Sequence, residues 1–214
     1  MNDQDFPVFD AKAFDDWANS YDADINREAG FPFEGFSAVM NEIIRCAAPQ
    51  PGMHILDLGT GTGELAARFA GSGCRVIGTD FSPEMLKMAQ QKYPFINFQF
   101  QDLLQPWPAE IGEKYDRIVS AYVFHHFPLQ KKVELVQEMG THLEPDGQIV
   151  IGDLSFGTST HLNEARQHYG EAWDEELYWV KAEALPALKQ AGFHSTYKQI
   201  SYCAGVYCIS PFPG

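Results

Sequence analysis

A glycine-rich segment near residue 60 has the residue types and spacing of a ligand-binding turn. Residues 55–65 read Ile-Leu-Asp-Leu-Gly-Thr-Gly-Thr-Gly-Glu-Leu, a short apolar run followed by Gly59, Gly61 and Gly63. Glycines at alternate positions let the backbone turn tightly and approach a ligand, and a following helix N-terminus offers free N–H groups to a carboxylate. The dinucleotide fingerprint has a small residue where this sequence has Glu64, whose charge would repel a pyrophosphate. The segment therefore predicts a nucleotide-like cradle, argues against NAD and leaves room for a ligand that carries no phosphate.

Acidic residues stand at or just after the ends of neighbouring apolar runs. Asp80 follows residues 75–79, and Asp102 follows residues 96–100. Parallel strands end at one edge of a sheet, where open α/β folds bind ligands. Carboxylate lone pairs accept hydrogen bonds from hydroxyl or amino groups. For Asp57 two interpretations stay open: it caps the turn, or it contacts a ligand amino group, directly or through water.

Short apolar runs alternate with helical patterns from residue 54 onward, which is typical of βαβ units. We expect strands at 54–58, 75–79, 96–100, 115–121 and 148–153, and helices at 64–70, 83–91, 129–142 and 181–191. Residues 194–209 read as two antiparallel strands turned at Ala204 and Gly205. The predicted fold class is α/β, a doubly wound, mostly parallel seven-stranded sheet with helices on both faces, an antiparallel C-terminal hairpin and a small helical cap.

Two segments outside this alternation predict the cap. Residues 1–48 contain two helical patterns, and we expect them to form part of the cap. Residues 49–214 form the predicted ligand-binding α/β domain. Within it, residues 154–180 are rich in acids and aromatic rings and are predicted to be a cap insertion over the carboxyl edge of the sheet.

Composition restricts the classes of partner. The 214 residues include 29 Asp and Glu against 15 Lys and Arg, a formal charge of −14. This charge repels phosphate backbones and anionic lipids, so we expect no nucleic-acid or membrane partner and a small neutral or cationic substrate. Residues 1–9 lack the features of a signal peptide and no apolar run is long enough to span a bilayer, which favours a cytoplasmic location. We expect the cysteines to be thiols, although Cys203 and Cys208 can face each other across the hairpin.

The order of these segments resembles that of the class I S-adenosylmethionine-dependent methyltransferases. Residues 57–63 match the first motif of that family, Asp-x-Gly-x-Gly-x-Gly. The second, third and fourth motifs and the stretch entering the fifth strand resemble residues 76–86, 100–103, 115–127 and 143–151. The resemblance spans about residues 50 to 155, and residues 14–22 resemble the opening of small-molecule methyltransferases. The whole is similar to a bacterial group of uncharacterised methyltransferases.

This resemblance implies S-adenosylmethionine as cofactor and S-adenosylhomocysteine as product. It implies that Asp80 accepts hydrogen bonds from both ribose hydroxyls and Asp102 from the adenine amino group, and that Tyr21 covers the site and donates to the cofactor carboxylate. The cofactor-binding residues that we expect are Tyr21, Asp57, Gly59, Gly61, Gly63, Asp80, Phe81, Met85, Asp102, Leu103 and Ala121, with Phe81 and Met85 on the adenine face.

His125 and His126 follow the fourth predicted strand and are the catalytic candidates. An imidazole can take a proton from a methyl acceptor near neutral pH. Neighbouring residues point in different directions, so we expect at most one histidine to face the substrate and no metal held by both. A purely structural role for either stays open. Metal-dependent relatives have acids after this strand, whereas residues 120–122 are Ser-Ala-Tyr, and we expect no metal.

Large aromatic rings are the candidates for the substrate pocket. We expect Trp17, Trp173 and Tyr178 to contact the substrate, with packing of the cap as the alternative. Residues 174–176, Asp-Glu-Glu, are predicted to be a solvated helix face, and their alternative role is a trap for a cationic acceptor.

The predicted function is in-line transfer of the cofactor methyl group to a small molecule, in which positioning and exclusion of water carry much of the rate. The acceptor atom stays open, as does the need for a general base. Three alternatives remain: an NAD-type oxidoreductase, which Glu64 disfavours, a non-enzymatic S-adenosylmethionine sensor, and a transferase that uses another arm of the same cofactor.

Overall fold

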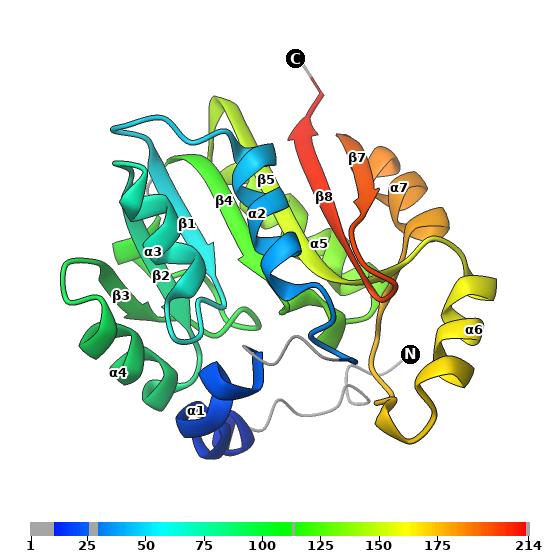
Figure 1. The fold of residues 1–214 in the computed structure, drawn as a ribbon. Coiled ribbons are helices and arrows are strands. Elements are labelled where there is room, and N and C mark those ends of the chain that lie inside the picture. Colours follow the sequence, from blue (N-terminus) through cyan, green and yellow to red (C-terminus); the bar gives the residue numbers. More distant parts are fainter. Residues whose placement is uncertain (1–10, 26–29, 113, 213–214) are drawn as a thin grey trace.

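A twisted sheet forms the centre of the molecule (Figure 1). The computed structural model describes residues 11–25, 30–112 and 114–212. The strands are β1 His54–Leu58, β2 Arg75–Asp80, β3 Asn97–Phe100, β4 Tyr115–Ala121, β5 Leu143–Phe156, β6 Trp179–Val180, β7 Phe193–Gln199 and β8 Ala204–Pro211. Seven of them follow the order β3-β2-β1-β4-β5-β8-β7, and β6 pairs with β5 alone. Strands β1 to β5 run parallel, whereas β8 is antiparallel to β5 and β7.

Helices and short 3₁₀ turns connect the strands. The α-helices are α1 Ala11–Ile25, α2 Phe36–Ala47, α3 Glu64–Gly71, α4 Pro83–Lys92, α5 Leu129–Thr141, α6 Ser159–Tyr169 and α7 Lys181–Gln190, and the 3₁₀ helices are η1 Ala109–Ile111, η2 Phe124–His126 and η3 Gly170–Ala172. Ser82 caps α4, because its hydroxyl accepts a hydrogen bond from the Met85 amide at 3.2 Å and Pro83 takes the first helical position.

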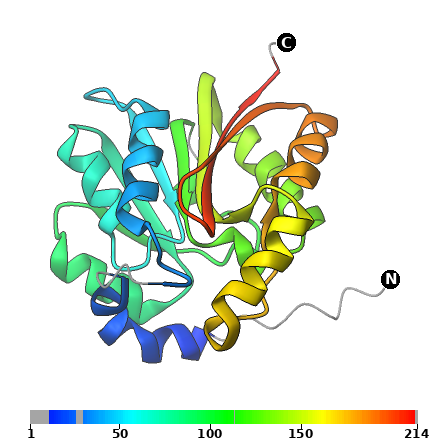
Figure 2. The ribbon, with the colours of Figure 1, turned by 45° about the vertical axis from the view of Figure 1, so that its right-hand side comes forward.

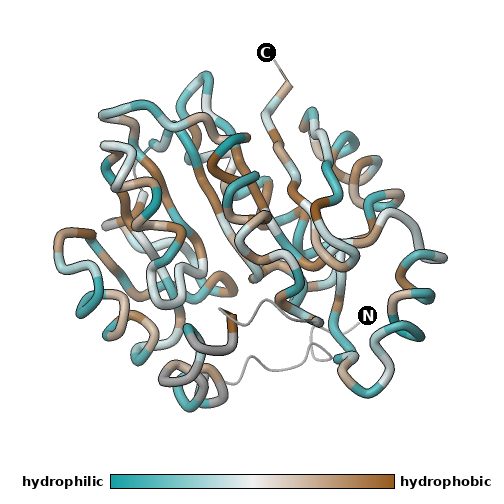
Figure 3. The backbone as a smooth tube through the Cα atoms, in the orientation of Figure 1, coloured by the Kyte–Doolittle hydropathy of each residue, from teal (hydrophilic) through white to brown (hydrophobic). Residues whose placement is uncertain are grey.

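Two apolar clusters cover the two faces of the sheet. One joins α2 and α3 to β1, β5 and β8, and the other joins α5 and α7 to β1, β4, β5 and β8. Figures 1 and 2 show α2 and α3 in front of the sheet and α5 and α7 behind it. The central strands are largely hydrophobic and the helices are mixed, as expected when each helix buries one face (Figure 3).

Helix α1 lies beyond the carboxyl ends of the strands, away from the two covering layers (Figure 1). It packs against α4. The segment between β5 and β6 contains α6 and η3 and returns the chain to the same edge. No helix within the described ranges is long and apolar enough to cross a membrane.

The predicted fold class is confirmed, with two local corrections. Strands β1 and β4 have the predicted bounds, but β5 runs from Leu143 to Phe156, so residues 154–156 are strand because they continue the ladder toward β6 and β8. The hairpin turn predicted at Ala204 and Gly205 is wrong, since both residues pair with β5 in β8. Gly205 is small because a Cβ there would collide with the ring of Tyr197.

The cysteine expectation is also wrong. A disulfide joins Cys46 of α2 to Cys208 of β8, with their Cα atoms 6.5 Å apart. Cys203 is buried and free. It precedes β8, outside the paired residues, so the alternative in which Cys203 faces Cys208 across the hairpin is not formed either. Because α2 packs on the sheet over β8, Cys208 pairs with Cys46, which lies 162 positions away in the sequence.

Candidate functional site

A cavity of about 290 Å³ lies at the carboxyl edge of the sheet, beneath α1. Predicted residues that line it are Tyr21, Gly59, Gly61, Asp80, Phe81, Met85, Asp102, Leu103, Ala121, His125, His126 and Tyr178. The other lining residues are Phe14, Phe31, Pro32, Phe33, Gln101, Tyr122, Val123, Phe127, Leu154, Ala172, Asp174 and Glu176. The fold thus brings residues from α1, from the ends of β1 to β5 and from the segment before β6 into one space.

The glycine-rich turn leaves β1 and opens α3. Gly59 and Gly61 both have left-handed backbone angles, with φ of 69° and 55°, and both line the cavity. A Cβ on Gly61 would project toward Tyr21, 3.8 Å from its Cε1 atom. Gly63 lies outside the lining; a Cβ there would lie 2.9 Å from the Phe98 ring, so its small size serves packing between α3 and β3.

Asp80 ends β2 with its carboxylate fixed by the backbone. Oδ2 accepts a hydrogen bond from the Gly61 amide at 2.8 Å, and Oδ1 accepts one from the Ser82 amide at 2.9 Å. Burial raises the pKa of Asp80 to about 6, although these amide bonds oppose the shift. Each oxygen keeps a lone pair, so the ionised carboxylate can still accept hydrogen bonds from a ligand in the cavity.

Asp57 lies beneath the turn and does not line the main cavity. It is 1% exposed, and its Oδ2 accepts a hydrogen bond from the Thr60 hydroxyl at 2.7 Å. Burial, with the charge of Asp80, raises its pKa to about 7 against the effect of the Thr60 bond. These contacts support the turn from below.

The chain after β3 contributes Gln101, Asp102 and Leu103 to the cavity. Asp102 Oδ1 accepts a hydrogen bond from the Leu104 amide at 2.9 Å, which holds the carboxylate in place. Gln101 is 4% exposed, and its Oε1 atom has no hydrogen-bond partner among the described residues. A buried acceptor of this kind is costly unless a ligand or water satisfies it.

Helix α1 covers the cavity and is held against the N-terminus of α4. Asp15 Oδ1 accepts hydrogen bonds from the Ser82 hydroxyl at 2.5 Å and the Glu84 amide at 3.3 Å, at the N-terminus of α4. Burial and then the charges of Asp80, Asp22 and Asp57 raise the pKa of Tyr21. Tyr21 therefore remains a protonated hydrogen-bond donor. The side chain of Trp17 lies outside the described residues.

Tyr122 redirects the chain at the end of β4. It has a φ of 57°, a left-handed conformation that is strained for a bulky side chain, and its ring stacks on Phe36 with centroids 5.3 Å apart. The 3₁₀ helix η2 follows and places both histidines in the cavity wall, with ring centroids 4.0 Å apart. Both histidines line the cavity because strand alternation does not extend into a 3₁₀ turn, and the expectation that at most one of them faces the substrate stays a prediction.

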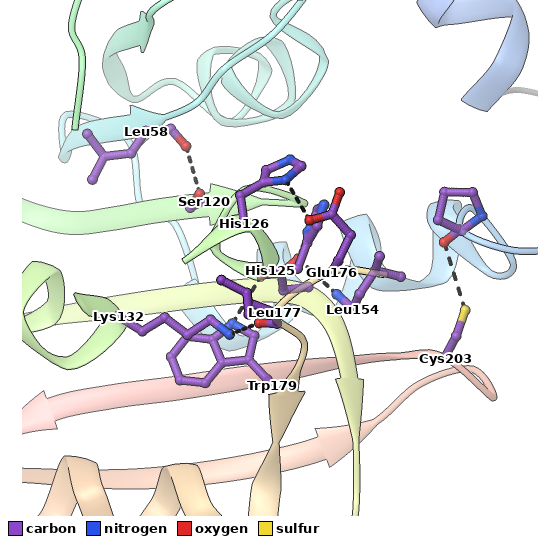
Figure 4. Close-up of polar contacts among 12 residues, drawn as sticks. Leu58, Ser120, His125, His126, Lys132, Leu154, Glu176, Leu177, Trp179 and Cys203 are labelled. Atoms are coloured by element: carbon purple, nitrogen blue, oxygen red, sulfur yellow. Dashed lines mark hydrogen bonds and ion pairs between the residues drawn. The ribbon is translucent and has the colours of Figure 1, made fainter. Parts of the chain in front are cut away.

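His125 contacts a buried carboxylate that the sequence did not indicate. Its Nδ1 atom lies 2.6 Å from Oδ1 of Asp153 in β5, and Asp153 is 0% exposed. The Leu154 amide donates to the same Oδ1 at 2.8 Å, and Trp179 Nε1 donates to Oδ2 at 3.0 Å. Figure 4 draws His125, Leu154 and Trp179 as neighbours in this group of polar contacts.

The segment before β6 forms the opposite wall. Glu176 Oε2 lies 3.3 Å from His126 Nδ1, and burial lowers the pKa of His126 against the opposing effect of Glu176. The Leu177 amide donates to the His125 carbonyl at 2.8 Å, and Lys132 Nζ donates to the Leu177 carbonyl (Figure 4). Lys132 is 1% exposed over the Trp179 ring, and burial lowers its pKa to about 8.

Aromatic rings complete this wall in two layers. Phe31 and Tyr178 line the cavity in an edge-to-face contact, with centroids 6.0 Å apart. Trp173 stands behind them, stacked on Phe31 at 5.0 Å, and does not line the cavity. Its buried indole nitrogen has no partner among the described residues.

Asp153, Lys132 and Gln101 are polar residues of this site that sequence reasoning missed. Asp153 carried the same signal as Asp80, an acid at the carboxyl end of a parallel strand. Asp174 and Glu176, predicted to be part of a solvated helix face, lie in an irregular segment and line the cavity. In the part of the chain that the structure describes, no three His, Cys, Asp or Glu side chains are grouped to hold a metal ion.

Comparison with known proteins agrees with this geometry. The sequence pattern of a family described as a methyltransferase domain matches residues 55–147. A protein of Anoxybacillus flavithermus named "Uncharacterized methyltransferase" is 31% identical over 184 residues, covering 82% of this chain and 84% of that protein.

Solved structures share the fold at lower identity. A DhpI complex with S-adenosylhomocysteine has a TM-score of 0.72 and 19% identity, covering 95% of this chain and 96% of that chain. Magnesium protoporphyrin IX methyltransferase of Synechocystis with bound S-adenosylmethionine has a TM-score of 0.66 and 20% identity, covering 98% of this chain and all of that chain. The chain therefore belongs to the methyltransferase family and has the fold of S-adenosylmethionine-dependent methyltransferases.

Proposed function

We propose that this methyltransferase moves a methyl group from S-adenosylmethionine to a small neutral or cationic molecule inside the cavity beneath α1. One observation carries the proposal: Asp80, Asp102, His125 and His126 all line a single cavity. Asp80 ends β2, and Asp102 follows the adjacent strand β3. Carboxylates that can accept hydrogen bonds from a nucleoside and histidines that can take a proton therefore lie in the same cavity.

The residues present fit the nucleoside part of this cofactor. Asp80 is held by two amides and keeps lone pairs for ribose hydroxyls. The buried Oε1 atom of Gln101 lacks a partner that an exocyclic amino group would supply. Gly61 leaves room beside Tyr21 that a side chain would fill.

When bound, S-adenosylmethionine supplies an electrophilic methyl group on a positively charged sulfur. The protein's part is to orient the reactants and exclude water. Phe81 and Met85 pack on the adenine face, Tyr21 donates to the cofactor carboxylate, and His125 meets the acceptor. We assign the roof of the cavity to α1 and to the segment between β5 and β6, over the α/β domain of residues 49–214, whereas α2 covers a face of the sheet.

The charge of the cavity wall favours a neutral or cationic acceptor. Four of the described lining residues are acids: Asp80, Asp102, Asp174 and Glu176. No described lining residue is Lys or Arg. An anionic acceptor would be repelled by this wall. The faces of Phe31 and Tyr178 suit a cation or an aromatic ring. With the overall charge of −14, we expect no nucleic-acid or membrane partner.

Cofactor binding and product analysis test the proposal. Calorimetry is expected to show binding of S-adenosylmethionine and S-adenosylhomocysteine and none of NAD or NADP. Incubation with methyl-labelled cofactor and a small-metabolite extract is expected to give one labelled compound together with S-adenosylhomocysteine. Tight NAD binding, or methylthioadenosine as the product, would contradict methyl transfer.

Two variants separate chemistry from cofactor binding. His125→Ala is expected to lower turnover about a hundredfold and leave cofactor affinity near the wild-type value, the pattern for loss of a general base. Tyr21→Phe is expected to weaken cofactor binding first. Wild-type turnover in His125→Ala and in His126→Ala would show that neither histidine is the base.

A further inference from the structure

The surroundings of the buried contact between His125 and Asp153 determine which atom donates the hydrogen bond. Asp153 Oδ1 and Oδ2 already accept hydrogen bonds from the Leu154 amide and the Trp179 indole. An ionised carboxylate is only an acceptor, and two fixed N–H donors favour the ionised form. The third partner, His125 Nδ1 at 2.6 Å, is therefore the donor.

The surroundings fix the ring from other sides. The His125 carbonyl accepts the Leu177 amide at 2.8 Å, which holds η2 against the segment before β6. Because Nδ1 is engaged with buried Asp153, the remaining nitrogen, Nε2, is the one available to the cavity that His125 lines. A proton on Nδ1 leaves Nε2 with a free lone pair.

On the basis of the proposed methyl transfer, we infer that Asp153 holds His125 as the Nδ1–H tautomer, so that Nε2 takes a proton from the methyl acceptor. Asp153 is a positioning residue, since it acts through His125. The substrate class follows: the acceptor atom carries a proton to be lost, as in a hydroxyl, a thiol or an ammonium group. An acceptor that reacts through a bare lone pair, such as a thioether, would have no use for this base.

The step balances in atoms and charge. The acceptor X–H bond breaks and its proton goes to Nε2, while the electron pair on X forms the bond to the methyl carbon. The carbon–sulfur bond breaks with its electron pair left on sulfur, which becomes a neutral thioether. The positive charge that entered on sulfur ends on the imidazolium of His125, beside the Asp153 carboxylate, and the proton later leaves to solvent.

Several charged groups surround His125. His126 lies beside it in η2, Asp153 contacts it from β5, and Glu176 interacts with it from the segment before β6. Lys132 on α5 acts on Asp153. Of these, Asp153 alone is bonded to the ring, so its removal has the largest expected effect on the His125 titration.

The histidine ring spectrum tests the inference directly. In long-range proton–nitrogen spectra of the full ¹⁵N-labelled chain with bound S-adenosylhomocysteine, His125 is expected to be protonated on Nδ1 and not on Nε2 at pH 8. His125→Gln assigns the signals. In Asp153→Asn, the Nδ1–H preference is expected to disappear and the titration midpoint of His125 to fall by about one pH unit or more, the effect of losing an adjacent opposite charge.

Glu144→Gln is the matched control, because Glu144 is an exposed acid on the same strand. It is expected to keep the wild-type tautomer and midpoint. An Nε2–H tautomer in the wild type overturns the inference, and so does an unchanged midpoint in Asp153→Asn. If Asp153→Asn fails to fold, the wild-type spectrum decides alone.

The labelled product from the metabolite extract tests the substrate class. Methylation at an atom that carried a proton agrees with the inference, whereas a sulfonium product, formed from a thioether that has no proton to lose, overturns it. A wild-type chain that does not bind S-adenosylhomocysteine contradicts the proposed function instead. The two failures are therefore distinguishable.

Discussion

Asp22 of α1 accepts a hydrogen bond from the Thr62 hydroxyl in the glycine-rich turn, with Oδ1 and Oγ1 2.6 Å apart. Its second oxygen accepts one from Lys92 Nζ at 2.7 Å, at the end of α4. Asp15 holds the same helix at the start of α4. The roof is thus fastened to the elements that form the cofactor side of the cavity, and ligand entry requires some of these contacts to open.

Loss of the Asp22 carboxylate is expected to speed cofactor release. Asp22→Ala removes the bonds to Thr62 and Lys92, and hydrogen bonds to charged groups are worth about 1.5–3 kcal/mol. Stopped-flow measurement of S-adenosylhomocysteine dissociation should show a rate about tenfold above the wild type. Asp16→Ala, on the exposed side of the same helix, serves as control. Equal rates in both variants would show that these bonds do not hold the roof.

Asp80 is expected to make cofactor binding depend on pH. Its pKa of about 6 in the free protein means that the carboxylate becomes protonated as the pH falls through 6. Calorimetry of S-adenosylhomocysteine should show weaker binding at pH 5 than at pH 7.5. In Asp80→Ala, affinity should fall by about 1.5–3 kcal/mol and this part of the pH dependence should vanish. An unchanged dissociation constant would remove Asp80 from the site.

Asp57 is expected to lower the stability of the free protein as the pH rises. Its folded-state pKa of about 7 lies above the unfolded value of about 3.9, so between these values the folded chain binds more protons. Its contribution is complete below pH 4 and is lost as the pH rises through 7, with a slope of up to about 1.4 kcal/mol per pH unit.

The measurement is urea unfolding at several pH values between 5 and 8 for the wild type and Asp57→Asn, whose amide oxygen can still accept the Thr60 bond. The difference in the free energy of unfolding should grow with pH in favour of the variant. Asp146→Asn, at an exposed site, should parallel the wild type. Parallel curves for Asp57→Asn would contradict the raised pKa.

Gln101 is expected to matter for the ligand more than for the fold. Among the described residues, Gln101 Oε1 has no partner and Nε2 donates one bond, to the Asp102 carbonyl at 3.1 Å. The loss of this bond and the relief of the unpaired oxygen offset each other, so Gln101→Met should change the free energy of unfolding by less than about 1 kcal/mol. The same variant should weaken S-adenosylhomocysteine binding about tenfold, since a ligand donor loses its acceptor. Gln99→Met, half-buried on β3, should leave affinity unchanged. Wild-type affinity in Gln101→Met would show that the ligand does not use this oxygen.

Local sequence signals were sufficient for the framework of the site. The glycine spacing at residues 59–63 indicated the turn after β1, and the helical pattern at residues 83–91 indicated α4, which spans Pro83–Lys92. Asp80 and Asp102 could be placed together because parallel strands end at one edge, whatever the details of packing. These features depend on neighbours within a few residues or on a general rule of the fold.

Contacts between distant segments were decided by the tertiary structure alone. Asp153 meets His125 across 28 positions, and Asp22 meets Thr62 across 40. The strained turn at Tyr122 places both histidines in the wall. Gly205 leaves space for the ring of Tyr197 on the adjacent strand. In the sequence alone, this glycine indicated a turn. Such pairings arise from strand order, register and side-chain packing, which residues far apart determine together, and no local pattern records them.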